Sequence, residues 1–382
     1  MRNERTIKLL GSWLSCASVK EEEIMQKIIT QVFLILLIYL ASTPVIGVVH
    51  SQDKSALVDN LNVILSKQKE DQPGVSVLVK KNNEIIYQLS KGLANKVNNN
   101  SISSHTGFRI GSISKPFTAL AIMKLVEQKK LSLDDQITKY IQELPTGWED
   151  ITIKYLLSHR VYISDDFFSD SNLNLVNLST NQDVIKFISS NMIKVKPQAF
   201  DKAIYCNSCY VLLAEVIAKV SGVSFSEYLS ENIFVPANMK NSYIVEKGVT
   251  IKPNDALNYA KTESIFGIRQ YTTGAMAQVS SIEDLNNFIV ALKEGQIISQ
   301  KSLISMTKVH SDAGNDGSFG LGWIIGWGDE PFYSHGGSQD GYQAELFFYP
   351  KHDLEIVILT NGGDETYELQ SKVMRAIITH YN

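Results

Sequence analysis

The chain has 382 residues, of which 44% are hydrophobic and 20% are charged, and its formal net charge is −4. A slightly acidic chain without a basic patch interleaved with aromatic residues has no electrostatic reason to bind phosphate, so we expect no nucleic-acid partner. From about residue 52 onward the composition is that of an ordinary globular protein, without an internal repeat or a low-complexity linker.

Residues 1–51 are predicted to form an N-terminal leader. Residues 28–49 contain no charged side chain, Lys27 precedes them, and residues 32–41 are almost purely apolar. This pattern is typical of the hydrophobic region of a signal peptide, with a cleavage site after Ser51. The alternative is an uncleaved membrane anchor, because an uncharged stretch of this length is just sufficient to span a bilayer.

Both interpretations place the main domain outside the cytoplasm, because the basic residue lies on the N-terminal side of the apolar stretch. After signal cleavage the domain would be periplasmic or secreted, whereas without cleavage residues 28–49 would attach it to the membrane. Residues 1–24, with the acidic run 21–23, make a poor start for a signal peptide. Met25 is therefore an alternative initiator.

Downstream of the leader, residues 55–66 are predicted to form a helix, and residues 74–89 to form two strands joined by the turn 81–83. A central helix is predicted over 116–130. Pro116 suits its first turn, where the missing N–H costs nothing. The later helices are expected over 184–193, 210–220 and 281–292, the later strands over 323–327, 343–349 and 354–360, and a last helix over 365–379.

This order of elements predicts an α+β fold, in which an antiparallel sheet is flanked by helices and carries an inserted all-α subdomain. Residues 52–382 would form this domain. Its α/β part would comprise about 55–115 and 270–382, and its helical part about 116–269, where residues 131–265 read as mostly helices and loops.

Ser112 and Lys115 form an S-x-x-K pattern directly before the central helix. If a helical turn begins at Ser112, the two residues share a face, and the lysine amine can reach the serine hydroxyl. A serine hydroxyl is a poor nucleophile until a base takes its proton, and a desolvated lysine can serve as that base. Taken alone, the spacing is a weak indication of catalysis, because a capping serine followed by a surface lysine is common.

Tyr205 and Asn207 form a second motif. A tyrosine can relay a proton beside the serine and lysine, and an asparagine amide can bind both a substrate carbonyl and the lysine. The alternative is that Asn207 is the N-cap of the apolar helix over 210–220, which ends before Gly222. Both interpretations can hold together.

His335, Gly336 and Gly337 form a third motif, in a segment typical of a strand edge and a turn. Glycines here let the backbone approach a ligand, and a nearby N–H could donate to an oxyanion. For this motif alone, a glycine-rich hairpin that carries an incidental histidine is the simpler interpretation.

Cys206 and Cys209 form a C-x-x-C pattern within the second motif. Structural zinc sites take four ligands, and the chain has neither a second C-x-x-C nor a suitably spaced histidine pair, so we expect no metal site. A thioredoxin-like redox role requires a βαβ setting, whereas this pair precedes a helix. We expect two small buried thiols, with a local disulfide as the alternative in an oxidising compartment.

Two other motif classes are absent from the sequence. No G-x-S-x-G elbow of the α/β-hydrolases occurs. Gly320 and Gly322 could begin a dinucleotide-binding loop, but Ile325 stands where the third glycine is required. We therefore expect no cofactor.

Together and in this order, the three motifs resemble those of the serine β-lactamases and penicillin-binding-protein-like hydrolases. The resemblance is to the branch with class C β-lactamases, D-alanyl-D-alanine carboxypeptidases and family VIII esterases, and it spans about residues 55–380. It implies an α/β part and an all-α part, with the motifs in the cleft between them. Further stretches that carry it are Pro73-Gly74-Val75-Ser76-Val77, Phe108-Arg109-Ile110-Gly111-Ser112, Ile153-Lys154-Tyr155-Leu156-Leu157-Ser158-His159, Gly320-Leu321-Gly322-Trp323 and Leu359-Thr360-Asn361.

The resemblance gives each motif residue a role. It implies an oxyanion hole formed by the backbone N–H groups of Ser112 and Ser338. The other implied roles are nucleophile for Ser112, activating base for Lys115, proton shuttle for Tyr205, and substrate binding for Asn207, His335, Gly336 and Gly337.

His335 occupies a position where class C β-lactamases usually carry lysine and many carboxypeptidase-like and esterase-like relatives carry histidine. A lysine provides a fixed cation for a substrate carboxylate. A histidine provides one only when protonated, with an ordinary pKa of about 6.5. This difference disfavours β-lactam hydrolysis.

Two departures from the family pattern affect the site. After His159, relatives commonly continue Thr-Ser-Gly, whereas residues 160–162 are Arg-Val-Tyr here, which should alter the turn into the cleft. The following segment, 164–183, is rich in Ser, Asn and Asp and is expected to form a loop that covers the site and sets specificity. The second departure is Cys206, where serine is frequent, and we expect its side chain to point away from the substrate.

We therefore expect an exported serine hydrolase that forms an acyl-enzyme on Ser112 and hydrolyses an amide or an ester, with a D-Ala-D-Ala-type peptide as a candidate substrate. Its expected partners are small-molecule or peptide substrates. Within the same chemistry, the alternative is an esterase or a weak β-lactamase. From a different class, the alternative is a catalytically silent cell-wall or protein-binding module, suggested by the altered turn at residues 160–162.

Overall fold

The contacts in the computed structural model divide the chain into two units, residues 1–57 and 58–382. In the first unit only the beginning of helix α3 (Ile46–Ser66) is described, so the predicted leader lies largely outside the described residues. The predicted loop over 164–183 also lies outside them up to residue 177. The described residues are 46–163, 178–259, 271–312, 314, 317–326 and 331–381.

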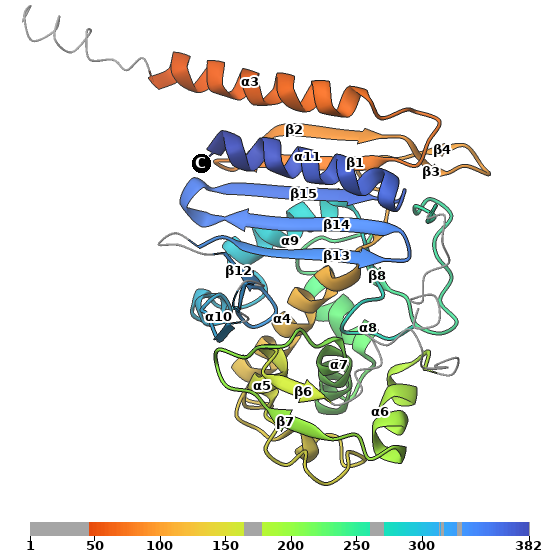
Figure 1. Cartoon of the computed structure of the whole chain (residues 1–382), viewed down its shortest axis with the longest axis vertical. Helices are drawn as coiled ribbons and strands as arrows, with labels where there is room; N and C mark the ends of the chain where they lie inside the picture. Colours follow the sequence, from red (N-terminus) through yellow and green to blue (C-terminus); the bar gives the residue numbers. More distant parts are fainter. Residues whose placement is uncertain are drawn as a thin grey trace, which may run out of the picture. The chain divides into compact units, whose positions relative to one another are not determined.

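Among the described residues, an eight-stranded antiparallel sheet organises the second unit (Figure 1). Its strand order is β10-β11-β12-β13-β14-β15-β1-β2, so the N-terminal hairpin lies beside the C-terminal strands. β1 pairs with β15 from Val75, opposite Thr360, to Lys81, opposite Leu354. The strands of this sheet are β1 (Val75–Lys81), β2 (Glu84–Lys91), β10 (Ser311–Asp312), β11 (Ser318–Phe319), β12 (Ile324–Ile325), β13 (Tyr333–Gln339), β14 (Tyr342–Tyr349) and β15 (Leu354–Thr360).

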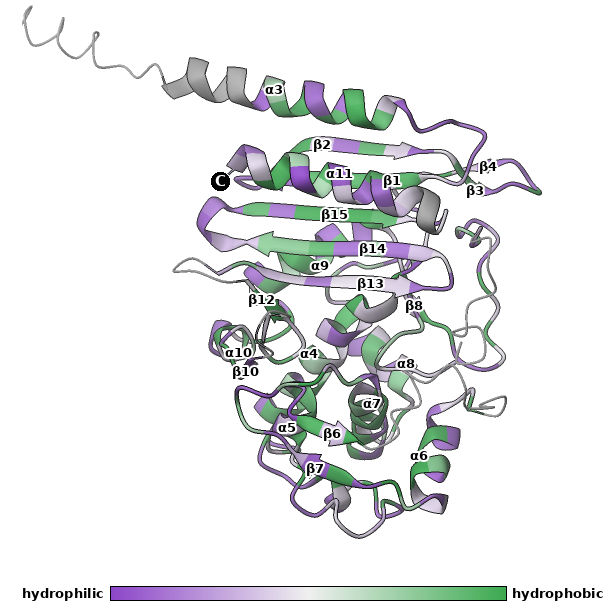
Figure 2. Cartoon of the chain, in the orientation of Figure 1, coloured by the Kyte–Doolittle hydropathy of each residue, from purple (hydrophilic) through white to green (hydrophobic). Residues whose placement is uncertain are grey.

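Helices cover both faces of this sheet. In Figure 1, α11 (Asp364–Tyr381) lies in front of the sheet and α9 (Ile282–Lys293) lies behind it, and both contact β15. Because both faces are covered, every residue of β15 is buried, and Figure 2 shows it as mostly hydrophobic. The predicted antiparallel sheet flanked by helices is confirmed.

A mostly helical region follows β5 (Phe108–Arg109). Its central helix, α4 (Ser114–Glu127), is buried on nearly every side, as expected of a helix that is hydrophobic all round, and α7 (Asn207–Ser221) packs against it. Elsewhere among the described residues are the helices α5 (Ile153–Leu157), α6 (Asn181–Ser190), α8 (Phe225–Leu229) and α10 (Gln300–Met306), a π-helix (Ser230–Phe234) and two 3-10 helices (Ile137–Lys139 and Pro350–His352). The short strands are β3 (Leu93–Asn95), β4 (Asn100–Ser101), β6 (Val161–Ile163), β7 (Val195–Pro197), β8 (Tyr243–Ile244) and β9 (Gln278–Ser280).

Most predicted elements are present with shifted ends. α3 begins at Ile46 rather than at residue 55, and α4 begins at Ser114. α6 begins at Asn181, because Thr180 forms a reciprocal capping box in the first turn, so the last residues of the predicted loop are helical.

No single helix in the described parts of the chain has the length and apolar composition needed to cross a bilayer. α7 and the segment Phe225–Phe234, bent by 80° relative to each other, meet that test only as a pair, by length and composition. Both belong to the buried core.

Candidate active site

Ser112 lies in a tight 3-10 turn, Gly111–Ile113, between strand β5 and helix α4. Gly111 has a φ of +51°, a left-handed conformation that favours glycine, and a side-chain carbon there would stand 2.8 Å from the Ser338 amide nitrogen. The Ser114 hydroxyl donates to the Gly111 carbonyl over 2.7 Å and closes the turn. The turn leaves Ser112 partly exposed between two buried neighbours.

Lys115 is fully buried, and its amine joins the first two motifs. Nζ donates to Ser112 Oγ over 3.1 Å, to Asn207 Oδ1 over 2.7 Å and to the Ala275 carbonyl over 3.1 Å. The expected reach of the lysine to the serine hydroxyl is therefore present. These acceptors hold the amine at hydrogen-bonding distance from the oxygen whose proton it would take.

Tyr205 stands beside this pair, with its ring centroid 4.8 Å from the Lys115 amine. The residue as a whole is 36% exposed, but its hydroxyl lies among protein atoms, and this burial raises the pKa of the phenol. A hydrogen bond with Ser112 opposes the shift without cancelling it. Tyr205 therefore stays protonated at neutral pH and can donate or relay a proton.

Asn207 is the first residue of α7, and the N-cap is Cys206, whose Sγ accepts from the Cys209 amide. The alternative that Asn207 caps the helix is thus wrong, and its amide oxygen is instead bonded to Lys115.

The prediction of two thiols is also wrong, because Cys206 and Cys209 form a disulfide. A C-x-x-C at the start of a helix spans less than one turn, and the two Cα atoms lie 5.4 Å apart, within the range for a bridge.

His335 lies inside strand β13 and is 2% exposed. Its Nδ1 donates to the Gly336 carbonyl over 2.7 Å. Burial and, to a smaller extent, the charge of Lys115 lower the pKa of His335 to about 3. The imidazole is therefore neutral at neutral pH and offers no fixed cation to a substrate carboxylate.

The strand that carries the third motif lies directly against the Ser112 turn. A side-chain carbon on Gly337 would overlap the Ile110 carbonyl and stand 3.3 Å from the Ser112 amide nitrogen. Together with the approach of Gly111 to Ser338, this packs the two backbone segments that carry the expected oxyanion-hole donors, Ser112 and Ser338, against each other.

Gly336 faces away from this turn, because successive residues of a strand point to opposite faces. It lies opposite Glu345 on β14, and a side-chain carbon on Gly336 would stand 3.2 Å from the carboxylate. A side chain at position 336 would therefore point toward Glu345 and not toward Ser112.

The altered turn after His159 builds a small ribbon. Strand β6 pairs with β7, and Arg160 Nε donates to the Gln198 carbonyl over 3.1 Å. The contacts among Ser112, Lys115 and Asn207 are present beside this ribbon.

Two groups at the site are not part of the three motifs. The Ala275 carbonyl binds Lys115, and its segment is held by two hydrogen bonds between Asn181 and Thr273. The His159 ring stacks on Tyr205, with 4.7 Å between ring centroids. A backbone carbonyl carries no sequence signal, whereas His159 stands in one of the stretches that carry the family resemblance.

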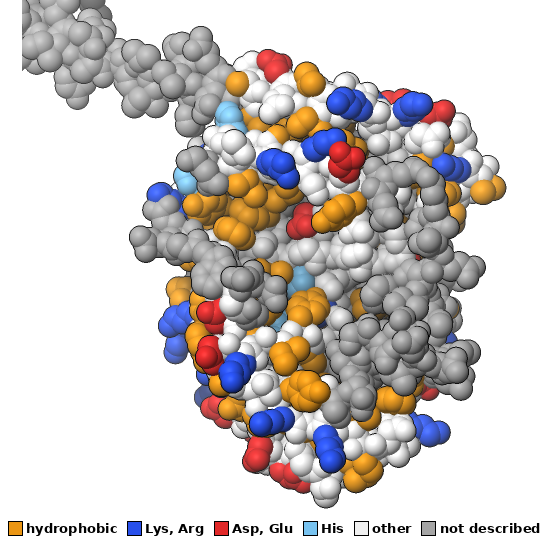
Figure 3. All heavy atoms as spheres, viewed as in Figure 1, with side chains coloured by type: hydrophobic (Ala, Val, Ile, Leu, Met, Phe, Trp, Pro, Cys, Tyr) orange, Lys and Arg blue, Asp and Glu red, His pale blue; other side chains and the backbone are white. Residues whose placement is uncertain are grey.

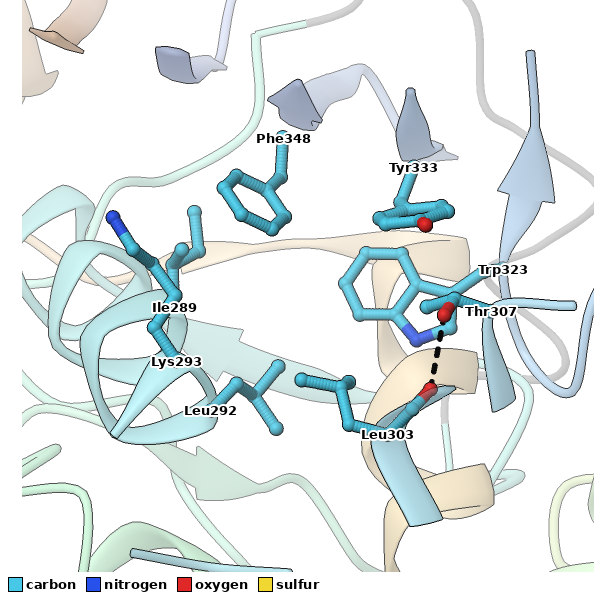
Figure 4. Close-up of a pocket in the computed structure, with 8 residues that line it drawn as sticks. All are labelled: Ile289, Leu292, Lys293, Leu303, Thr307, Trp323, Tyr333 and Phe348. Carbon is cyan, nitrogen blue, oxygen red and sulfur yellow. Dashed lines mark hydrogen bonds between the residues drawn. The ribbon is translucent and has the colours of Figure 1, made fainter. Parts of the chain in front are cut away.

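A hollow opens in the face shown in Figure 3, with a histidine side chain visible inside it. A separate, apolar pocket lies among α9, α10 and the strands that carry Tyr333 and Phe348 (Figure 4). None of the motif residues lines it. Within the described ranges, no group of three or more His, Cys, Asp or Glu side chains is placed to hold a metal ion.

The family model described as Beta-lactamase matches residues 60–377 of this chain. The chain belongs to the beta-lactamase family. It is a serine hydrolase of the β-lactamase and penicillin-binding-protein type, and both the resemblance and the fold class expected from the sequence are confirmed.

Known proteins and structures extend this assignment. Over 323 residues the chain is 26% identical to Penicillin-binding protein 4* of Bacillus subtilis, covering 79% of this chain and 70% of that protein. The crystal structure of a penicillin-binding protein from Bacillus halodurans is similar, with a TM-score of 0.71 and 26% sequence identity; the match covers 84% of this chain and 98% of that one. It shares the fold of D-amino acid amidase from Ochrobactrum anthropi, with a TM-score of 0.67 at 23% identity, covering 85% and 99%.

Proposed function

We propose that this protein is an exported serine hydrolase that forms an acyl-enzyme through Ser112 and releases it with water, acting on an ester or an amide. The observation that carries the proposal is the 3.1 Å hydrogen bond from Lys115 Nζ to Ser112 Oγ. Asn207 and Ala275 fix the amine at that distance. A purely structural role gives no reason for these groups to converge on one partly exposed hydroxyl.

In the acylation step, Lys115 reacts in its neutral, free-amine form: it accepts the Ser112 proton while Oγ attacks the substrate carbonyl carbon. Tyr205, protonated and bonded to Ser112, donates a proton to the leaving group and is reprotonated from Lys115. The backbone N–H groups of Ser112 and Ser338 stabilise the developing oxyanion. Deacylation uses water in place of the leaving group, with the proton path reversed.

The neutral His335 limits which substrate group can bind beside it. Its Nδ1 proton is donated to Gly336, so Nε2 is an acceptor. An acceptor suits a substrate N–H or O–H and repels a carboxylate. This supports an ester or a neutral amide as the first candidate, ahead of a D-Ala-D-Ala-type peptide, whose terminal carboxylate needs another donor, and ahead of a penicillin.

The candidate from a different class is a catalytically silent binding module. It was suggested by the altered turn at residues 160–162, which in the structure leads into the β6–β7 ribbon. The bonded Ser112, Lys115 and Asn207 side chains beside that ribbon support turnover instead.

Export is part of the proposal. It is supported by the apolar leader and by the Cys206–Cys209 disulfide, because disulfides persist mainly in oxidising compartments. Cell fractionation with N-terminal sequencing of the mature protein tests it: a start after Ser51 indicates cleavage, an intact membrane-bound chain indicates an anchor, and a cytosolic protein contradicts export.

Turnover of a substrate panel tests the catalytic proposal. The panel contains p-nitrophenyl and alkyl esters, neutral amides, a penicillin and a D-Ala-D-Ala peptide. Wild type is compared with Ser112→Ala and with the matched control Ser230→Ala, which removes an exposed hydroxyl. We expect ester or amide hydrolysis that Ser112→Ala abolishes and Ser230→Ala keeps. Equal rates in wild type and Ser112→Ala would contradict the proposal, and no turnover at all would favour the binding module.

A further inference from the structure

His159 follows Ser158, the C-cap of α5, and is 2% exposed. Its ring is enclosed by aromatic side chains. It stacks on Tyr205 with 4.7 Å between centroids and 24° between planes, meets the edge of Phe319 at 4.7 Å, and lies 5.2 Å from the ring of Tyr210. The Tyr205 ring therefore rests on the imidazole.

Hydrogen bonds to the same histidine flank Tyr205 on both sides. The Ile204 N–H donates to the His159 carbonyl over 2.9 Å. The Cys206 N–H donates to His159 Nδ1 over 3.0 Å. Tyr205 is thus held by its ring and by the backbone of both neighbours.

These contacts matter because Tyr205 belongs to no helix or strand. Residues 202–206 form an irregular segment that ends where α7 begins. No regular backbone ladder sets the direction of the phenol, so side-chain packing and the two hydrogen bonds must do so.

The hydrogen bond to the imidazole requires a neutral ring, because Nδ1 must offer a lone pair to the Cys206 amide. Burial, and then the nearby charges of Lys115 and His335, lower the pKa of His159 well below its usual value. Among the described residues, two further titratable side chains, Tyr205 and Tyr210, pack against the ring. The contact therefore persists across the neutral range.

We propose that His159 is a positioning residue that fixes the Tyr205 hydroxyl for proton transfer, by stacking on its ring and bonding the backbone on both sides of it. This inference rests on the proposed function of Ser112 and adds a residue to which that proposal assigns no role.

Two variants separate the contributions of the ring and the acceptor. His159→Phe keeps an aromatic ring and removes the acceptor for the Cys206 amide. His159→Asn keeps an acceptor and removes the ring, and asparagine tolerates the φ of +56° at this position. We expect each to lower kcat for an alkyl ester by about tenfold or more, with KM changed by less than about threefold.

The leaving group provides a readout that a merely structural role would not affect. An alkoxide must be protonated as it leaves, whereas p-nitrophenolate leaves without a proton. The loss of kcat should therefore be larger with the alkyl ester than with the p-nitrophenyl ester. The matched control is His105→Asn, which replaces a histidine with a 65% exposed side chain and should leave both rates unchanged.

A double-mutant cycle with Tyr205→Phe decides whether His159 acts through the tyrosine. If it does, adding His159→Asn to the Tyr205→Phe variant lowers kcat by less than about threefold. An equal cost in both backgrounds, or unchanged kcat in the single variants, would overturn the inference. If His159→Phe fails to fold in a melting experiment, His159→Asn alone decides. Full activity of Ser112→Ala would instead refute the proposed function itself.

Discussion

The two walls of the candidate site are built in different ways. On the helix side, the 3-10 turn before α4 and the first turns of α4 and α7 contribute side chains, with Lys115 bonded to Ser112 and Asn207. On the sheet side, β13 contributes backbone and the neutral imidazole of His335. In the proposed mechanism, the helix side carries out the reaction and the sheet side selects the substrate.

Substitutions on the helix side should lower the catalytic rate more than substitutions on the sheet side. In Lys115→Ala the base and three hydrogen bonds are lost, so we expect kcat/KM to fall about 10³-fold for the best ester. Lys130→Ala, which removes an exposed lysine just after the same helix, should stay within about twofold of wild type. A loss in Lys115→Ala below about tenfold would show that another group takes the Ser112 proton.

The stability of the protein in acid tests whether His335, on the sheet side, is neutral in the folded protein. His335 has a pKa of about 3 when folded and about 6.5 when unfolded, so below pH 6.5 the unfolded chain binds a proton that the folded protein does not. The free energy of unfolding then falls as the pH falls, by about 2 kcal/mol at pH 5 from this residue.

His335→Gln removes that contribution, so urea unfolding should show a smaller loss between pH 7 and pH 5 than in wild type. His352→Gln, at a partly exposed histidine just before β15, should keep the wild-type loss. The same pH dependence in wild type and His335→Gln would mean that His335 is not held neutral.

The helix side also carries the disulfide. Cys206→Ser with Cys209→Ser keeps an oxygen to cap α7 but opens the cross-link, which closes a very short loop. We expect the free energy of unfolding to fall by about 2 kcal/mol, measured by urea titration. Two free thiols in the denatured, unreduced wild type, or equal stability of the two proteins, would contradict this.

Selectivity should show the smallest effect. His335→Lys places a fixed cation where the imidazole is neutral. We compare kcat/KM for an ester that carries a carboxylate on its leaving group with kcat/KM for the matching uncharged ester. The ratio of the two should rise about tenfold in the variant. An unchanged ratio would show that this side chain does not meet the leaving group.

The sequence predicted the helix side well because its signals are local. Ser112 and Lys115 are three residues apart before an apolar helix, and that spacing alone brings their side chains together. The neutrality of His335 could not be predicted, because it depends on burial among residues distant in sequence, such as Tyr205, whose ring centroid lies 6.1 Å from that of the imidazole. The disulfide could not be predicted either, because one C-x-x-C pattern allows both two thiols and a disulfide.

His159 shows a second limit of the sequence. Its role depends on a ring contact with Tyr205 and a bond to the Cys206 amide, both made across the fold. The stretch Leu-Leu-Ser-His indicated the family but not the contact. The fold class was predictable because alternating strands and periodic helices repeat over many residues, whereas element ends depend on single caps such as Thr180.

The most direct test of the central claim is intact-mass spectrometry after rapid acid quenching of the protein with a slow ester. The account predicts a transient mass increase equal to one acyl group, present in wild type, absent in Ser112→Ala, and located on the peptide that contains Ser112. An adduct that survives in Ser112→Ala, or substrate turnover without any adduct at the shortest times, would contradict it.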